Sequence, residues 1–277
     1  MTTRSFFCAV DCAPSEQLDM ANLDQWYSLA CVMTDSEEHL DALKSVLEAK
    51  CREITKNFVL NQYRSKKKVS AYARQVLTGT STVEWHENSA VFIFSNTGAE
   101  IAAGIDQYWT QLRLSRWMPR KPKNYGSPVG PIKGMDEDHK AWETRQFSFA
   151  QGIPVIWMAS CIHLLMKHVT KLCSADQVEW KIVSDPIAGD NRAHHDKGKL
   201  LVGCLQHSAT GGAHFEFGDD DRDSALEMAD TYAGIAQDCL RYQDRDSWIE
   251  KREKLIAMPH VHWTFGRQGP PFAGANA

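Results

Sequence analysis

Apolar residues form short runs near the start of the chain and recur at helical spacing further along it. A continuous apolar run over residues 6–10 stops at Asp11, and a second run covers residues 26–33. Short runs of this kind, bounded by polar residues, are typical of buried β-strands. Shorter apolar or alternating stretches predict four further strands, at residues 83–85, 90–95, 178–184 and 214–217.

Helices are predicted where apolar residues repeat every three or four positions. Leu40, Leu43 and Leu47 follow the candidate N-cap Ser36 at this spacing, which predicts a helix over residues 36–55. Ser224 and Glu227 match a capping box that opens a helix ending near residue 240. The same reasoning predicts helices at residues 66–77, 99–114, 154–172, 191–206 and 247–256.

The order of these elements predicts a single α/β domain over residues 1–277. Early strands followed by helices and a late strand–helix pair indicate a mixed sheet with helices on its faces. The periodicity fails over residues 115–152, where four prolines and four glycines predict an irregular surface insertion. Residues 257–277 are interpreted as a C-terminal tail.

Composition narrows the class of protein. The 277 residues are 43% hydrophobic, which excludes a disordered or collagen-like chain. The longest apolar stretch, residues 152–166, is shorter than the roughly 20 residues of a membrane span, and Asp11 interrupts the only N-terminal apolar run. Eight cysteines without a CxxC pair are expected to be reduced, buried thiols, so we expect a cytoplasmic protein with no membrane partner.

Three aspartates stand where they could converge on a metal ion. Asp11 closes the first predicted strand, Asp185 closes a late strand, and Asp230 lies two turns into the helix that begins at Ser224. Mg²⁺ and Mn²⁺ take oxygen ligands, and a few carboxylates suffice for a phosphoryl-transfer site. Each aspartate also has an ordinary structural role open to it, in a turn or on a solvated helix face.

The C-terminal helix carries a resemblance to a known family. The segments Leu226-Glu-Met-Ala-Asp230 and Ala233-Gly234, preceded by a short strand and a polar turn, resemble the C-terminal signature of domain-of-unknown-function family 3800. The N-terminal strand ending in an aspartate is similar to that family as well. The resemblance implies a ribonuclease-H-like mixed sheet flanked by helices, and a metal-dependent nuclease with Asp11, Asp185 and Asp230 as catalytic metal ligands.

Two departures from the family pattern leave an alternative open. Asp11 is followed by Cys12-Ala13-Pro14, whereas the family has Asp-Glu-Ser-Gly, and Asp185 is followed by proline and not by a second acid. Glu227, three residues before Asp230, is a weaker candidate ligand, and its capping-box role is favoured. The alternative is a catalytically degenerate ribonuclease-H-like subunit with a binding or assembly role in a mobile-element or anti-phage system, whose partner is a nucleic acid or a protein.

Charge is divided unevenly along the chain, although the net charge is only −4. Residues 56–123 hold eleven basic and four acidic side chains, and residues 219–253 hold five basic and eleven acidic ones. A basic track with an interleaved aromatic suits a nucleic-acid backbone, and a solvated basic face is the other interpretation. The candidate nucleic-acid contacts are Lys66, Lys67, Lys68, Arg116, Trp117, Arg120 and Lys121.

The sequence lacks the motifs of several other enzyme classes. The chain has no GxSxG, HExxH, P-loop or GxGxxG motif, which argues against serine hydrolases, zincins and common nucleotide-binding folds. Cys12 lies next to Asp11, and a neighbouring carboxylate raises the pKa of a thiol, so a thiol nucleophile is discounted. The three aspartates and the resemblance to family 3800 together favour a phosphodiesterase that uses Mg²⁺ or Mn²⁺, with the degenerate subunit as the alternative.

Overall fold

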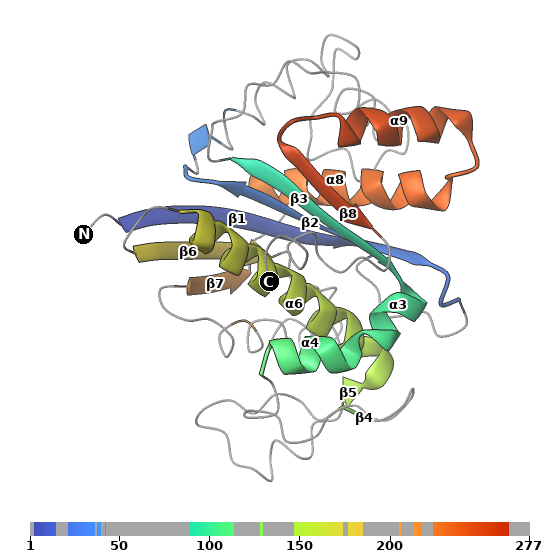
Figure 1. Ribbon diagram of the computed structural model, residues 1–277, viewed down its shortest axis with the longest axis horizontal. Coiled ribbons are helices and arrows are strands. Elements are labelled where there is room, and N and C mark those ends of the chain that lie inside the picture. The colour runs from blue at the N-terminus through green and yellow to red at the C-terminus, as the bar shows by residue number, and fades with distance from the viewer. Residues whose placement is uncertain are drawn as a thin grey trace.

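The computed structural model has a six-stranded mixed sheet as its centre (Figure 1). It describes residues 3–14, 22–36, 38–39, 42, 89–113, 128–129, 147–173, 177–184, 205, 213–217 and 224–265. The strands, in the order in which they lie side by side, are β7 (Ala213–Phe217), β6 (Gln177–Ser184), β1 (Thr3–Ala13), β2 (Trp26–Thr34), β3 (Ala90–Thr97) and β8 (Val261–Phe265). The chain therefore folds as an α/β protein, as its pattern predicts.

The sheet consists of an antiparallel meander, β1 to β3, and three further strands that pair in parallel at its two sides. β1, β2 and β3 pair antiparallel, with Val10 opposite Cys31 and Ala30 opposite Ile93. β6 pairs with β1 in parallel, and β7 pairs in parallel with β6. On the other side of the meander, β8 pairs in parallel with β3. β1 is thus central and is buried on both faces over most of its length.

Helices cover both faces of the sheet, and each face has its own apolar core. α6 (Phe149–Leu172) lies on one face, with α3 (Gly98–Ala103) and α4 (Ile105–Gln111) packed against it. α8 (Ser224–Arg241) lies on the opposite face over β1 and β2, and α9 (Asp246–Ile256) packs beside it (Figure 1). Alternate residues of β1 serve the two cores, since Cys8 and Val10 join the α6 core while Phe7 and Ala9 join the α8 core.

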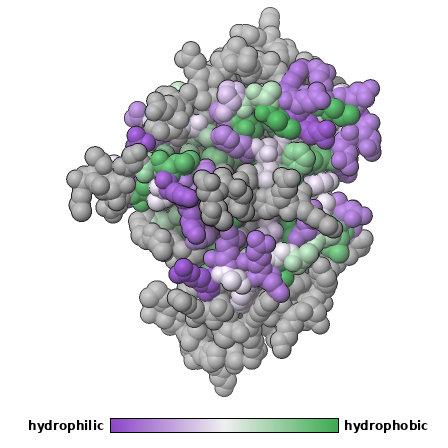
Figure 2. All heavy atoms as spheres, in the orientation of Figure 1, coloured by the Kyte–Doolittle hydropathy of each residue, from purple (hydrophilic) through white to green (hydrophobic). Residues whose placement is uncertain are grey.

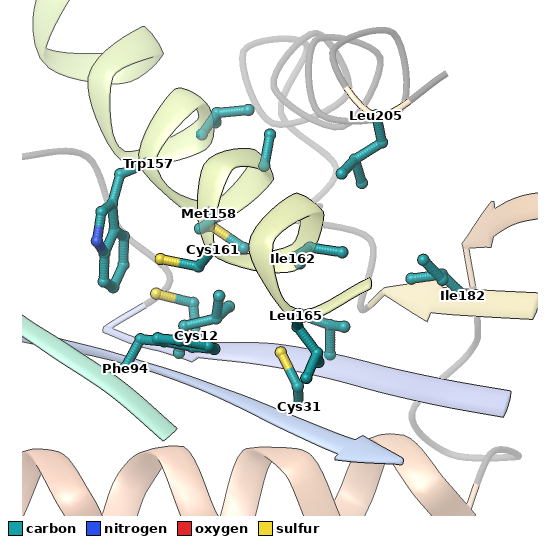
Figure 3. Close-up of a cluster of buried hydrophobic side chains, with 14 of the residues drawn as sticks. Cys12, Cys31, Phe94, Trp157, Met158, Cys161, Ile162, Leu165, Ile182 and Leu205 are labelled. Atoms are coloured by element: carbon teal, nitrogen blue, oxygen red, sulfur yellow. The ribbon is translucent and has the colours of Figure 1, made fainter. Parts of the chain in front are cut away.

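The α6 core gathers several of the cysteines. Cys12 and Cys31 from the sheet and Cys161 from α6 point into the same layer, beside Trp157 and Leu165 (Figure 3). Six cysteines are described; all are free thiols, and all except Cys173 are buried. The expectation of buried thiols is confirmed for the five buried ones, which act as small apolar side chains in the cores: Cys8, Cys12, Cys31, Cys161 and Cys239.

α6 is the most apolar helix of the described chain. The window Ile153–Leu172 has the length and composition of a membrane span, but 72% of it is buried within the fold. It serves as a core helix. It begins at Phe149, five residues before the predicted start at Pro154, so the proline lies inside the helix. β4 (Pro128–Val129) and β5 (Phe147–Ser148) form a small separate pair next to its first turn, within the predicted insertion.

Several predicted elements are confirmed and others differ. The helix expected from residue 36 does begin there, since the Ser36 hydroxyl accepts from the backbone N–H of His39 (3.4 Å). The single helix expected over residues 99–114 is divided at Gly104, where an added Cβ would lie 2.7 Å from the Tyr108 ring. Residues 261–265, part of the expected tail, instead form β8.

The remaining predictions fall on parts of the chain that are not described. These are most of the helix over residues 36–55, the helix over 66–77, the strand over 83–85, the helix over 191–206 apart from residue 205, and most of the insertion over 115–152.

Candidate metal centre

Asp11 lies on the α8 face of the sheet. It is buried, and it belongs to β1, which continues for two more residues, so it does not close the strand as expected. Its neighbours Val10 and Cys12 belong to the α6 core, which directs the Asp11 side chain to the other face. One carboxylate oxygen, Oδ1, accepts a hydrogen bond from the backbone N–H of Cys12 at 2.7 Å. A buried carboxylate requires such partners.

The position of Asp11 coincides with the end of the neighbouring parallel strand. β6 ends at Ser184, whose Cα pairs with that of Val10, and β7 ends at Phe217 opposite Ser184. Asp11 is therefore the first residue of β1 beyond the ends of both strands. Asp185 follows Ser184 directly in the sequence, but it lies outside the described residues.

Asp230 lies on α8 beside the seam that packs against the sheet. Ala229, Ala233 and Ala236 are fully buried in the α8 core and form this alanine seam, and Asp230 is partly buried beside them. Gln237, seven residues later, lies on the same side of the helix. Its Nε2 donates to the carbonyl oxygen of Trp26, the first residue of β2, at 3.3 Å.

The contact between Gln237 and Trp26 fixes the position of α8 along the strand direction of the sheet. α8 runs in the same direction as β1, from the side of β7 towards the turn into α9 (Figure 1). Asp230 precedes Gln237 by about 10 Å along the helix axis. Asp11 pairs with Ala30, which is about 13 Å along β2 from Trp26. The structure therefore brings Asp11 and Asp230 to the same face of the sheet and to nearly the same level.

The other candidate residues are not brought into this geometry by the described part of the chain. Glu227 lies in the first turn of α8, and its side chain is outside the described set. Among the described residues, no group of three or more His, Cys, Asp or Glu side chains could hold a metal ion. The expected basic contacts at Lys66, Lys67, Lys68, Arg116, Trp117, Arg120 and Lys121 also lie outside the described residues.

Sequence reasoning missed a polar group on the same face. The hydroxyls of Ser28 and Ser95 lie 2.7 Å apart across β2 and β3, and Nε1 of Trp263 donates to the Ser95 hydroxyl at 3.0 Å. Ser28 alternates with Ala30, a member of the α8 core, so it shares the face of Asp11. The signal for this group was the presence of serines inside otherwise apolar strands.

The burial of Cys12 agrees with the expectation that its thiol is not a nucleophile. Burial, and secondarily the charge of Asp11, raise the pKa of Cys12 far above its ordinary value. Burial likewise raises the pKa of Cys161. Thiolate is the nucleophilic form of cysteine, so neither side chain is poised for covalent catalysis at neutral pH.

In comparisons with known proteins, no protein-family model and no curated protein sequence matches this chain significantly. The likeness to family 3800 therefore stays a prediction from the residues that carry it.

Proposed function

We propose that this protein is a ribonuclease-H-like, metal-dependent nuclease that hydrolyses nucleic-acid phosphodiester bonds. The observation that carries the proposal is that Asp11 and Asp230 lie on the α8 face at nearly the same level along the sheet. Strand order supports the fold assignment, because an antiparallel meander extended by two parallel strands beside its first strand is the arrangement expected of a ribonuclease-H-like sheet.

The donor chemistry suits a hard divalent cation. Asp11 and Asp230 offer carboxylate oxygens, which Mg²⁺ and Mn²⁺ prefer, and Asp185 is the proposed third ligand beyond the end of β6. When bound, the cation would lower the pKa of a water molecule and stabilise the leaving oxygen. The Cys12 N–H bond orients the Asp11 carboxylate, and the buried alanine seam of α8 fixes the approach of Asp230 to the sheet.

The absence of a second acid after Asp11 is compatible with this site. Position 12 faces the α6 core, so a glutamate continuing β1 there would point away from Asp11 and Asp230. Replacing it by Cys12 therefore removes no ligand from the α8 face. The same substitution allows position 12 to be buried as an apolar residue under Cys161 (Figure 3).

The experiment is a cleavage assay on labelled single-stranded and double-stranded oligonucleotides with Mn²⁺. Wild-type protein should cleave at least one of them, and Asp230→Asn should not. Asp106→Asn is the matched control, because Asp106 is exposed on α4 and α4 packs on α6, across the sheet from α8. Equal cleavage by wild type and Asp230→Asn contradicts the proposal.

The proposed alternative is a non-catalytic subunit of the same fold that binds nucleic acid or a protein partner. It predicts no cleavage by the wild-type protein and no stabilisation by Mn²⁺. Both readouts come from the same purified samples, so the two proposals are separated in one set of measurements.

A further inference from the structure

Three cations lie against two aromatic rings where α8 turns into α9. We name Arg241, Tyr242, Arg245, Trp248 and Lys251 the α8–α9 cluster. The guanidinium carbons of Arg241 and Arg245 lie 5.4 and 4.6 Å from the centre of the Tyr242 ring. Lys251 Nζ lies 3.9 Å from the centre of the Trp248 ring, and the two rings are 5.7 Å apart. Each of the three cations thus lies within cation–π distance of a ring.

None of these cations is neutralised by a carboxylate of the described chain. Arg241, Arg245 and Lys251 have no ion pair within the described residues, although Asp244 and Asp246 are close to them in sequence. A guanidinium that lies on a ring keeps its N–H donors in the guanidinium plane, where they can meet an anion. The cluster therefore offers positive charge and planar hydrogen-bond donors to a partner.

The cluster lies on the surface of the molecule. Arg241 and Arg245 are exposed, and hydrophilic side chains gather over α9 at the upper right of Figure 2. Nearby charge is compensated locally, since Lys254 pairs with Glu250 at 2.6 Å along α9. Arg241, Arg245 and Lys251 lie on the side of the turn where Tyr242 and Trp248 lie.

The cluster continues the face of α8 that carries the candidate metal ligand. Arg241 follows Asp230 by eleven residues, three helical turns, so both lie on the side of α8 marked by Gln237. The distance along the helix axis is about 16 Å. A nucleic-acid strand in a duplex advances about 3.4 Å per phosphate, so this distance corresponds to roughly five nucleotides.

We propose that the α8–α9 cluster binds the phosphates of a nucleic-acid strand whose reacting bond lies at the Asp11–Asp230 site. This inference rests on the proposed function for the position of the reacting bond. A chain of repeated phosphates suits this face of α8. One phosphate would contact the α8–α9 cluster while another lies at the proposed Asp11–Asp230 site, about 16 Å away along the helix axis. The planar guanidinium group loses little freedom for each hydrogen bond that it forms, which favours affinity.

The test measures binding without metal, so that it does not depend on cleavage. The probe is a fluorescein-labelled 20-nucleotide single strand, read by anisotropy in EDTA from 50 to 200 mM salt. Arg241→Gln/Arg245→Gln should weaken binding about tenfold and reduce the slope of log K against log salt by about 1.4, the value for two phosphate contacts. Lys167→Gln/Lys171→Gln, which removes the same charge from α6 on the other face, is the matched control.

Two further variants test the role of the ring. Tyr242→Ala should weaken binding without changing the charge, and Tyr242→Phe, which keeps the ring, should bind as wild type does. Equal affinity and equal salt slope for the arginine pair and the α6 control would overturn the inference. Displacement of the oligonucleotide by polyglutamate at equal charge concentration would also overturn it, in favour of an acidic protein partner.

Failure of the proposed function gives a different pattern. If wild-type protein fails to cleave with Mn²⁺ but the arginine pair still weakens binding, hydrolysis is excluded and the phosphate-binding surface is retained.

Discussion

Asp11 and Cys12 are adjacent in β1 and face opposite sides of the sheet, yet they are joined by a 2.7 Å hydrogen bond from the Cys12 backbone N–H to the Asp11 carboxylate. The pair separates two environments by one residue. Asp11 joins the α8 side, where Asp230 and the Ser28–Ser95 pair lie, and Cys12 joins the apolar α6 core. Within β1, the candidate metal ligand Asp11 and the core residue Cys12 are therefore only one position apart.

Mn²⁺ should stabilise the folded protein through Asp11. A ligand that binds only the native state at 100 times its dissociation constant adds about 2.7 kcal/mol. Thermal melts with and without millimolar Mn²⁺ should show this as a higher Tm for wild type and for Asp106→Asn. Asp11→Asn and Asp230→Asn should lose the shift. A wild-type Tm that does not respond to Mn²⁺ would favour the non-catalytic alternative.

The described cysteines should react with iodoacetamide in order of exposure. Burial raises the pKa of Cys12, Cys31 and Cys161, so little thiolate forms at pH 8 and the reagent has no access. Cys173, which is only partly buried, should be alkylated in the native protein. Peptide mass spectrometry before and after unfolding in urea provides the measurement. Native labelling of Cys161 as fast as that of Cys173 would contradict the packing of α6 on the sheet.

The sequence was sufficient for the elements that are decided locally. Continuous apolar runs identified β1 and β2 because both faces of these strands are buried, and capping residues identified the start of α8. β8 was missed because it is an edge strand with partly exposed alternate residues, and its partner β3 is distant in sequence. Pairing between such distant segments leaves little trace in local periodicity.

In the candidate site, too, the residue types could be predicted from the sequence, but their arrangement in space could not. The aspartates could be chosen from the sequence, but their common level on the α8 face depends on strand order and on the Gln237–Trp26 contact. The α8–α9 cluster was hidden because a count over residues 219–253 averages its cations with many acids. Its signal was the spacing of Arg241, Arg245 and Trp248, three or four residues apart.

Acidification should destabilise the protein through His260. Burial, and secondarily the neighbouring His262, lower the pKa of His260 to about 4. The unfolded chain therefore binds more protons than the folded one between pH 6.5 and about 4, so stability present above pH 6.5 is lost as the pH falls. The loss should be about 1 to 2 kcal/mol, because solvent screens a partly buried ring.

Urea unfolding of wild type and His260→Gln at pH 7.0 and 4.5 measures this contribution. The free energy of unfolding should decrease more for wild type than for the variant between pH 7.0 and 4.5. The difference between these two decreases is the contribution of His260. The pKa of His262 is also lowered by burial, so the variant should keep part of the pH dependence. Identical falls for both proteins would show that His260 is not buried in the folded state.

Enlarging the alanine seam should separate the packing of α8 from its chemistry. Ala233 is fully buried where α8 meets the sheet, so Ala233→Leu should lower the free energy of unfolding by about 1 to 3 kcal/mol through overpacking. Ala257→Leu, at the exposed end of α9, should change it by less than about 0.5 kcal/mol. Ala233→Leu should also diminish the Mn²⁺ shift, because displacing α8 moves Asp230 away from Asp11. A full Mn²⁺ shift in a destabilised Ala233→Leu protein would show that Asp230 is held by something other than the seam.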